Sequence, residues 1–292
     1  MAKILVTGSL GQLGRELQNI AEGGGSKGFS WLFTDVGELD ITDPAAVGSL
    51  FALQRPDAVV NCAAWTDVDG AEKDPEGAFR INEQGPRVLA EAAVQTGSVL
   101  IHISTDFVFD GAEHRPYTEQ DEPRPLNLYG ESKLAGERAV LESGCGGAIV
   151  RTSWLYSPYG RNFVKSILGA ASKNAEIRVV ADQWGNPTAA DGLAGAIVRM
   201  IPQLLAEPRR AEIYHYCDTG VASRSAFAAE IVRQAGLDCA VIPVASSEYP
   251  MAAERPAYSA LDTGRIGRDF GIVPRRWEDA LADVIGKVKS EK

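Results

Sequence analysis

The stretch KILVTGSLGQLG, residues 3–14, decides the fold class expected for this chain. Its apolar beginning predicts a strand from Lys3 to Thr7, and a helical pattern follows from Leu13 to Ala21. Glycines at this junction permit a tight turn and a close approach of backbone N–H groups to a diphosphate. Glycine turns are common, so this stretch alone leaves a dinucleotide site and a plain structural turn equally open. The candidate cofactor-binding residues in it are Gly8, Gly11, Gln12, Leu13 and Gly14.

Similar units of strand and helix follow along the first half of the chain. Predicted strands are 31–34, 58–62, 99–104 and 148–152, and predicted helices are 45–54, 75–96 and 128–142. The strand centres are almost entirely apolar, as expected where helices cover both faces of a parallel sheet. We therefore predict an α/β fold with a Rossmann-type doubly wound parallel sheet. In such a sheet, ligands bind at the carboxyl ends of the strands.

The pattern becomes less regular after about Arg151, where glycine and proline interrupt it repeatedly. We interpret this part as a smaller C-terminal substrate-binding lobe that is interleaved with the last elements of the sheet. The expected division is an NAD(P)-binding Rossmann domain over residues 1–155 and the substrate-binding lobe over residues 156–292.

The composition excludes several classes of protein. Of 292 residues, 45% are hydrophobic and 23% are charged, which is typical of a globular protein with a sizeable core. A formal net charge of −10 without a cluster of Lys and Arg argues against a nucleic-acid partner. No stretch reaches the roughly 18 apolar residues of a membrane span, and the four cysteines form no CxxC motif. We expect a cytoplasmic protein with reduced thiols.

Further candidates for cofactor binding follow the second and third predicted strands. Asp35 stands 21 residues after Gly14, near where a carboxylate accepts hydrogen bonds from the adenosine ribose, although it is equally a turn residue. Such a carboxylate would repel a 2′-phosphate and so favours NADH over NADPH. Asp40 and Ile41 form a second turn that could border the adenine. After the third strand, Ala63, Ala64 and Trp65 follow, where small residues let a cofactor lie against the backbone, although small residues also pack helices onto sheets.

Candidate catalytic residues follow the fourth strand. Thr105 directly follows that strand, and Tyr129 and Lys133 lie one turn apart on the same face of the next predicted helix. Reduction of a ketone needs a proton donor beside the hydride donor, and an ammonium that favours the phenolate brings a tyrosine closer to working pH. The Thr105 hydroxyl can orient the same substrate oxygen. Taken alone, the pair is more often a half-buried aromatic residue beside a solvated lysine.

The order of these features resembles the extended short-chain dehydrogenase/reductase superfamily and, within it, the dTDP-4-dehydrorhamnose reductase family. The resemblance covers the chain from the first strand to about Arg255. It rests on the segments 8–14, 104–111, 129–136, 151–154 and 182–188. That family reduces the 4-keto group of dTDP-6-deoxy-L-lyxo-4-hexulose with NADH or NADPH and forms dTDP-L-rhamnose.

The resemblance implies roles for individual residues. Tyr129 would be the proton donor, and Lys133 would tune its pKa and bind the nicotinamide ribose. Thr105 and Asp106 would contact the sugar. Trp154 would form an aromatic wall against the substrate, although without the resemblance a core tryptophan is the favoured interpretation. The resemblance also leads us to expect Arg255 at the diphosphate of the substrate, where the open alternative is a surface ion pair.

Two features bear on how far the resemblance extends. Phe107 stands where the family commonly has tyrosine, so any sugar contact of that hydroxyl is absent here. Some members bind Mg²⁺ through acidic residues at a dimer interface, and Glu16 and Asp191 lie at the matching positions. A third ligand is not identified. A homodimer that depends on Mg²⁺ is therefore a hypothesis.

The sequence leaves two other functions open. A nucleotide-sugar epimerase or dehydratase shares the fold and the YxxxK motif, but it regenerates its NAD⁺ within each turnover. A non-catalytic subunit is the alternative from another class, as in the regulatory subunit of methionine adenosyltransferase. The intact set of Thr105, Tyr129 and Lys133 argues against the second alternative.

Overall fold

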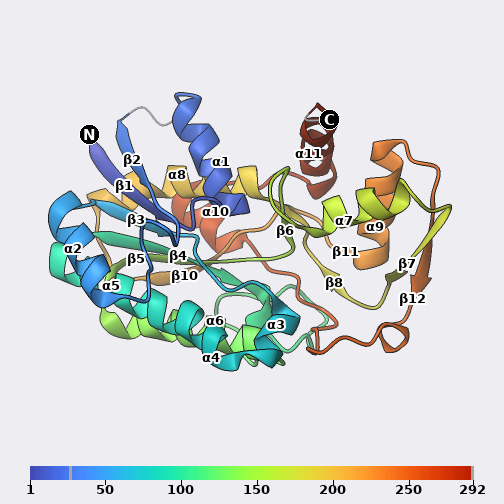
Figure 1. Ribbon diagram of the computed structural model, residues 1–292, viewed down its shortest axis with the longest axis horizontal. Helices are drawn as coiled ribbons and strands as arrows, with labels where there is room; N and C mark the ends of the chain where they lie inside the picture. The colour runs from blue at the N-terminus through green and yellow to red at the C-terminus, as the bar shows by residue number, and fades with distance from the viewer. Residues whose placement is uncertain (26–27, 291–292) are drawn as a thin grey trace.

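A six-stranded parallel sheet forms the centre of the molecule in the computed structural model, which describes residues 1–25 and 28–290 (Figure 1). The strand order is β10-β5-β4-β3-β1-β2, and every neighbouring pair is parallel. The strands are β1 (Ala2–Thr7), β2 (Phe29–Phe33), β3 (Ala58–Asn61), β4 (Val99–Thr105), β5 (Gly146–Thr152) and β10 (Glu212–His215). The predicted doubly wound sheet is confirmed, and all five predicted strands are present.

Helices cover both faces of this sheet because successive strand residues point to opposite sides. Ile4 and Val6 pack in one buried cluster with α1 and α8, whereas Leu5 packs in another with α2 and α5. Figure 1 shows these two groups of helices on opposite sides of the strands. The helices around the sheet are α1 (Gln12–Glu22), α2 (Pro44–Gln54), α3 (Val68–Lys73), α4 (Pro75–Phe79), α5 (Gly85–Thr96), α6 (Leu128–Ser143), α8 (Ala190–Ala206) and α10 (Gly264–Phe270).

The predicted helix over 75–96 contains a π-helical turn, η1 (Arg80–Gln84), between α4 and α5. Asn82 in this turn is buried and bonds to the backbone of Trp65 in both directions, accepting from its N–H and donating to its carbonyl. It also donates to the Ser132 hydroxyl of α6. A π-turn often accompanies a functional site. Here it connects the segment after β3 to the helix that carries Tyr129.

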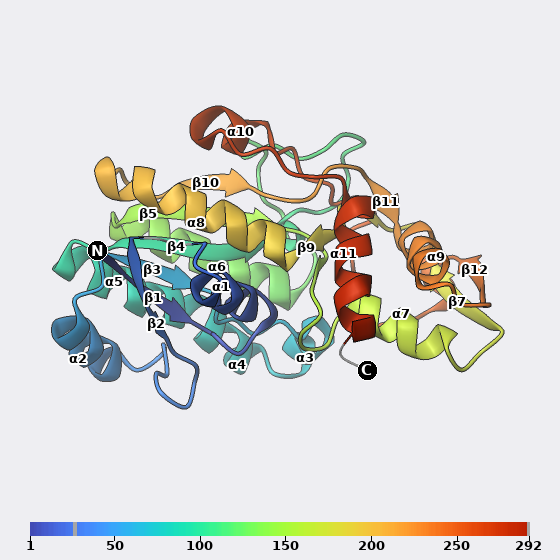
Figure 2. The same cartoon turned by 90° about the horizontal axis from the view of Figure 1, so that it is seen from above.

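A C-terminal lobe lies beyond the carboxyl ends of the strands (Figure 2). Its core contains Tyr156, Phe227 and Trp277. Its elements are β6 (Leu155–Tyr156), α7 (Phe163–Ala171), β7 (Glu176–Val180), β8 (Trp184–Gly185), β9 (Thr188–Ala189), β11 (Ala222–Ser223), α9 (Arg224–Ala235), β12 (Ala240–Val244), the 3-10 turn η3 (Ser246–Glu248) and α11 (Trp277–Ser290). Within the described residues, no helix has both the length and the apolar character needed to cross a membrane.

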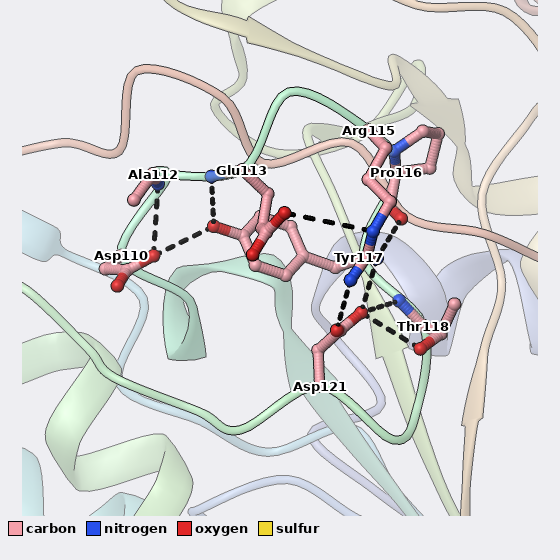
Figure 3. Close-up of polar contacts among 8 residues, drawn as sticks. All are labelled: Asp110, Ala112, Glu113, Arg115, Pro116, Tyr117, Thr118 and Asp121. Atoms are coloured by element: carbon pink, nitrogen blue, oxygen red, sulfur yellow. Dashed lines mark hydrogen bonds and ion pairs between the residues drawn. The ribbon is translucent and has the colours of Figure 1, made fainter.

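A compact loop joins the 3-10 turn η2 (Asp106–Val108) to α6 and is held by its own side chains (Figure 3). Asp121 accepts hydrogen bonds from the guanidinium of Arg115 and from the N–H and hydroxyl of Thr118. The backbone of Tyr117 pairs with the segment 260–262, through Tyr117 N to Ala260 O and Asp262 N to Tyr117 O, both 2.8 Å. The loop thus fixes this late segment of the chain beside the end of β4.

Candidate active site

A cavity of about 590 Å³ lies where the carboxyl ends of β1, β3, β4 and β5 meet the C-terminal lobe. This is where a doubly wound sheet binds its ligands. The predicted site residues that line it are Gly8, Gly11, Gln12, Leu13, Ala64, Thr105, Asp106, Tyr129, Lys133 and Trp154. The predicted ligand-binding residues outside its wall are Gly14, Asp35, Asp40, Ile41, Ala63, Trp65 and Arg255.

At the end of β1, the glycine turn lets neighbouring segments of the backbone approach each other closely. Gly8 has φ +64°, and a Cβ there would lie 2.6 Å from the backbone nitrogen of Ala63. A Cβ on Gly14 would lie 2.5 Å from Cα of Ser9. Gly11 occupies the N-cap position of α1 and has no side chain to cover the first-turn N–H groups. The residues therefore fit a dinucleotide diphosphate, which needs a close approach and exposed N–H donors.

The acidic residues after β2 have different surroundings. The Asp35 carboxylate accepts from Leu10 N at 2.9 Å, so it lies beside the glycine turn, where an adenosine ribose is expected. The Asp40 carboxylate accepts two hydrogen bonds from Thr42, which lower its pKa. Ile41 is buried against Gly85 at the start of α5. Asp40 and Ile41 therefore fix the local turn.

The segment after β3 approaches the same turn from the other side. Asn61 accepts hydrogen bonds from Thr7 and from Ala63 N, and this holds the end of β3 beside that of β1. Ala64 lines the cavity. The indole nitrogen of Trp65 donates to the carbonyl of Asp67.

Tyr129 and Lys133 project from the first turns of α6 into the cavity. Asn127 caps this helix by accepting from Gly130 N. A Cβ on Gly130 would lie 2.2 Å from the Phe107 carbonyl, so glycine lets α6 lie directly against the end of β4. The Lys133 ammonium donates to the Ile103 carbonyl at 2.7 Å.

Burial dominates the protonation of both side chains. It raises the pKa of Tyr129 to about 12, although a hydrogen bond with Thr105 acts in the opposite direction. Burial also lowers the pKa of Lys133 to about 8. Burial, opposed by the Thr105 hydrogen bond, thus governs the pKa of Tyr129, in place of the expected lowering by the Lys133 ammonium. At neutral pH the phenol carries its proton, as a proton donor must.

Thr105 and Asp106 lie next to the phenol. The Thr105 hydroxyl donates to Asp106 at 3.1 Å, and the Ser259 hydroxyl donates to the other carboxylate oxygen at 2.5 Å. Burial raises the pKa of Asp106 to about 6. Phe107 lines the cavity and meets Tyr129 edge to face, with ring centroids 5.7 Å apart. Phe107 therefore supports the tyrosine by packing.

A buried ion pair that sequence reasoning missed anchors α6 to the sheet. Arg151 of β5 bonds to both carboxylate oxygens of Glu137, at 2.8 and 2.6 Å, and both side chains are 1% exposed. The Ser104 hydroxyl donates to the same carboxylate. Glu137 lies one helical turn after Lys133, so this pair holds the catalytic face of α6 toward β4 and β5.

Trp154 and Arg255 come from the second half of the chain and were both predicted to bind the substrate. Their surroundings differ. Trp154 lines the cavity in a left-handed backbone conformation, φ +45°, which is rare for a bulky residue and common near functional sites. Its ring lies under the guanidinium of Arg224, 3.6 Å from the ring centroid. Arg255 instead forms two hydrogen bonds with Asp69, at 2.9 and 2.6 Å. The geometry of Arg255 therefore fits an ion pair, which was the alternative to a contact with the diphosphate.

Arg224 was not predicted, and no local signal marks it. It is the first residue of α9 and reaches the cavity only because α9 packs behind Trp154.

The proposed metal residues, Glu16 and Asp191, lie within the electrostatic reach of the same two cations, Arg275 and Lys287. Asp191 accepts a hydrogen bond from Arg275 and lies 3.6 Å from the ammonium of Lys287. Glu16 is buried, and burial raises its pKa. Among residues 1–25 and 28–290, no cluster of three or more metal-ligating side chains is present. Nothing in this region supports Mg²⁺.

Comparison with known families agrees with this geometry. Residues 2–290 match the family described as RmlD substrate binding domain. The chain belongs to this family. The predicted resemblance to the dTDP-4-dehydrorhamnose reductases is confirmed by relatives of that name at 38–44% identity over most of the chain.

Three members illustrate the similarity. The dTDP-4-dehydrorhamnose reductase of Streptomyces griseus is 44% identical over 282 residues, which cover 96% of this chain and 91% of that protein. A crystal structure of the Clostridium acetobutylicum reductase is 39% identical, with a TM-score of 0.93, and covers 98% of this chain and 99% of that one. The Bacillus anthracis reductase in complex with NADP is 37% identical, with a TM-score of 0.90 and coverage of 98% and 100%.

Proposed function

We propose that this protein is an NAD(P)H-dependent dTDP-4-dehydrorhamnose reductase. It reduces the 4-keto group of dTDP-6-deoxy-L-lyxo-4-hexulose to give dTDP-L-rhamnose. The observation that carries the proposal is the single cavity in which Thr105, Tyr129 and Lys133 meet the glycine turn of β1. The relatives of this name at up to 44% identity support the substrate.

Each catalytic side chain has a task that its surroundings support. When bound, the reduced nicotinamide supplies the hydride. Tyr129 donates its proton to the carbonyl oxygen, because burial keeps the phenol neutral. Thr105 holds that oxygen in place, and Asp106 accepts a hydrogen bond from a sugar hydroxyl. Lys133 is poised to bind the nicotinamide ribose.

Residues 1–155 hold the dinucleotide in this proposal, and residues 156–292 complete the nucleotide-sugar site. Gly8, Gly11, Gln12, Leu13 and Gly14 would hold the diphosphate of the cofactor through the glycine turn. Asp35 would accept hydrogen bonds from the adenosine ribose. Asp40, Ile41, Ala63, Ala64 and Trp65 would shape the turns that border the dinucleotide. The position of Asp35 favours NADH, whereas the relative from Bacillus anthracis was solved with NADP, so we propose that both cofactors are used.

The homodimer stays a prediction. Because Arg275 and Lys287 already neutralise Asp191, the proposal requires no Mg²⁺ at Glu16 and Asp191. Sedimentation with and without a chelator tests both points: a dimer that persists in the chelator is the expected result.

The direct test of the function follows oxidation of NADPH and NADH in the presence of the dTDP-4-keto sugar. We predict that Tyr129→Phe lowers kcat about a hundredfold or more, because the phenol oxygen that delivers the proton is gone. Binding of NADPH should persist, since the phenylalanine ring keeps the packing against Phe107. Full activity in this variant would contradict the mechanism.

The same assay separates the alternative functions. An epimerase or dehydratase would turn over without consuming reduced cofactor. A regulatory subunit would show no turnover with any dTDP-keto sugar. One molecule of cofactor oxidised for each sugar reduced is the result that the proposal requires.

A further inference from the structure

The cavity carries more positive charge than the protein as a whole would suggest. Among the described residues that line it, the cations are Lys133, Arg161 and Arg224, and the carboxylate is Asp106. The whole chain has a formal net charge of −10. A cationic cavity in an acidic protein suits ligands with several negative charges, because field lines concentrate in clefts.

The side chains of Arg161 and Arg224 both lack a hydrogen-bond or ion-pair partner among the described residues, but Arg161 is exposed and Arg224 is half-buried. Arg224 is therefore the cation whose hydrogen-bonding capacity is held inside the cavity. Its guanidinium lies 3.6 Å over the ring centroid of Trp154 and 5.3 Å from that of Phe163. It has no hydrogen-bond or ion-pair partner within the part of the chain that the structure describes. By contrast, Lys133 is bonded to the Ile103 carbonyl. Arg224 thus presents up to five N–H donors to the cavity.

The surroundings of Arg224 are built to hold it in place. Trp154 has the strained φ of +45°, and a Cβ on Gly185 would lie 2.7 Å from its indole ring, so the ring sits tightly against the backbone of β8. A guanidinium stacked on an indole keeps its N–H edge available for in-plane hydrogen bonds. Burial lowers the pKa of Arg224 only to about 10, so the group stays charged at neutral pH.

The position of Arg224 indicates which anion it meets. It comes from the C-terminal lobe, and its charge interacts with Asp106 at the end of β4 and with Arg255. The diphosphate of the dinucleotide is instead expected at the glycine turn of β1. Arg161 is exposed and lies on the cofactor side, because its neighbour Asn162 donates to Gln12.

We propose that Arg224 binds the diphosphate of the nucleotide sugar through its guanidinium fork and that Trp154 is the positioning residue that supports it. This inference rests on the proposed function and assigns to Arg224 the contact expected of Arg255. The substrate then meets the guanidinium edge, since Arg224 covers one face of the indole ring. Arg255 serves to join the segment around residue 253 to Asp69 of α3.

The test measures binding of dTDP, the diphosphate probe without the sugar, to the full chain by calorimetry. For Arg224→Met we expect the Kd for dTDP to rise about tenfold or more, because a bidentate charge-assisted contact is lost. The Kd for NADPH should change less than about twofold, and binding of uncharged thymidine should also be unchanged. The matched control is Arg233→Met on the exposed side of the same helix, where dTDP binding should equal that of the wild type.

Two results would overturn the inference. One is an unchanged Kd for dTDP in Arg224→Met, and the other is a loss of NADPH affinity as large as the loss of dTDP affinity. If Arg224→Met does not fold, Arg224→Lys provides the test, because lysine keeps the positive charge but cannot form the bidentate hydrogen bonds of a guanidinium. We expect weaker dTDP binding in this variant, and wild-type affinity contradicts the contact.

Trp154→Leu separates positioning from direct contact. Its Kd for dTDP should rise less than that of Arg224→Met, and adding Trp154→Leu to Arg224→Met should change little further. Additive effects in the double variant would contradict the positioning role.

This inference and the proposed function fail in different ways. If the wild type binds dTDP through Arg224 but reduces no dTDP-4-keto sugar, the proposed reaction is wrong and the diphosphate contact stands. If the wild type reduces the sugar while Arg224→Met keeps both the KM and the dTDP affinity of the wild type, the reaction stands and the contact is wrong.

Discussion

Asp106 is buried at the end of β4, where Thr105 and Ser259 donate to its carboxylate. Burial still raises its pKa to about 6. The proposed contact with a sugar hydroxyl uses the ionised form, which is lost as the pH falls through this value. We therefore predict that the KM for the keto sugar rises below about pH 6, whereas the Kd for NADPH stays constant. Steady-state kinetics from about pH 5 to pH 8 measures this.

Asp106→Asn is the control for that pH dependence. The amide does not titrate, so KM should be raised at every pH and should no longer change across the range from about pH 5 to pH 7. A rise in KM that persists in Asp106→Asn would assign the pH dependence to another group.

Asp218, which follows β10, is a single residue that makes the stability of the fold depend on pH. One of its carboxylate oxygens accepts from Ala189 N, and the other has no partner among the described residues. Burial raises the pKa of Asp218 to about 7, compared with about 4 in an unfolded chain. Because the folded state holds the proton more tightly, this group's contribution to stability is present below pH 4. It is lost as the pH rises from about 4 through 7.

Replacing Asp218 by Asn should remove this loss. We predict that the free energy of unfolding of the wild type falls relative to that of Asp218→Asn between about pH 4 and pH 8, by about 1.4 kcal/mol for each pKa unit. Urea titrations at several pH values give the difference. Parallel curves for Asp218→Asn would show that its carboxyl titrates normally.

At the scale of the elements, α6 depends on the buried contact between Glu137 and Arg151. Glu137→Gln leaves the guanidinium buried and without its counter-charge, which costs about 3–5 kcal/mol. Since the pair lies one turn from Lys133, we also expect a lower kcat through a shift of the catalytic face. Chemical denaturation and kinetics of the same preparation measure both effects.

The exposed pair of Glu83 and Arg87 provides the comparison. These side chains are 33% and 43% exposed, so Glu83→Gln should change the free energy of unfolding by less than about 1 kcal/mol. Equal effects of the two glutamine variants would show that the buried pair adds nothing to the anchoring of α6.

The regular elements could be predicted because their patterns are local. The strands around Ile4, Val59 and Ile101 are short apolar runs between turns, and the helix 128–143 begins at a capping asparagine. The strand at 212–215 was not identified individually. It is only four residues long, and its place beside β5 depends on a connection of about 60 residues, which no local pattern encodes.

The site residues likewise divide into those that a local pattern reveals and those that depend on contacts between distant parts of the chain. Tyr129 and Lys133 were found because four residues on a helix bring them to one face, and the glycine turn was found because it lies between a strand and a helix. Arg224 could not be found, because its role depends on packing against Trp154, 70 residues earlier in the chain. The ion pair of Arg255 with Asp69 depends on a contact across 186 residues.

At the scale of the whole molecule, the functional division at residue 155 does not separate two cores. The cluster on one face of the sheet combines Ile4 and Val60 with Leu193, Ile197 and Met200 of α8, all of which are fully buried. Strand β10 also covers the edge of β5. The second half of the chain therefore supplies part of the core of the first.

This arrangement predicts how a fragment of residues 1–155 behaves. Each missing large apolar side chain of α8 withdraws about 1.5–3 kcal/mol of burial, and several are lost at once, which exceeds the margin of a typical domain. We expect a fragment with weak near-ultraviolet circular dichroism and no cooperative urea transition, and with no measurable affinity for NADPH. The full chain with Ile197→Ala, which removes one contact of the same surface, should stay folded and lose about 2–5 kcal/mol. A sigmoidal urea transition of the fragment, with the steep slope of a domain of its length, would show instead that the dinucleotide half folds without α8 and β10.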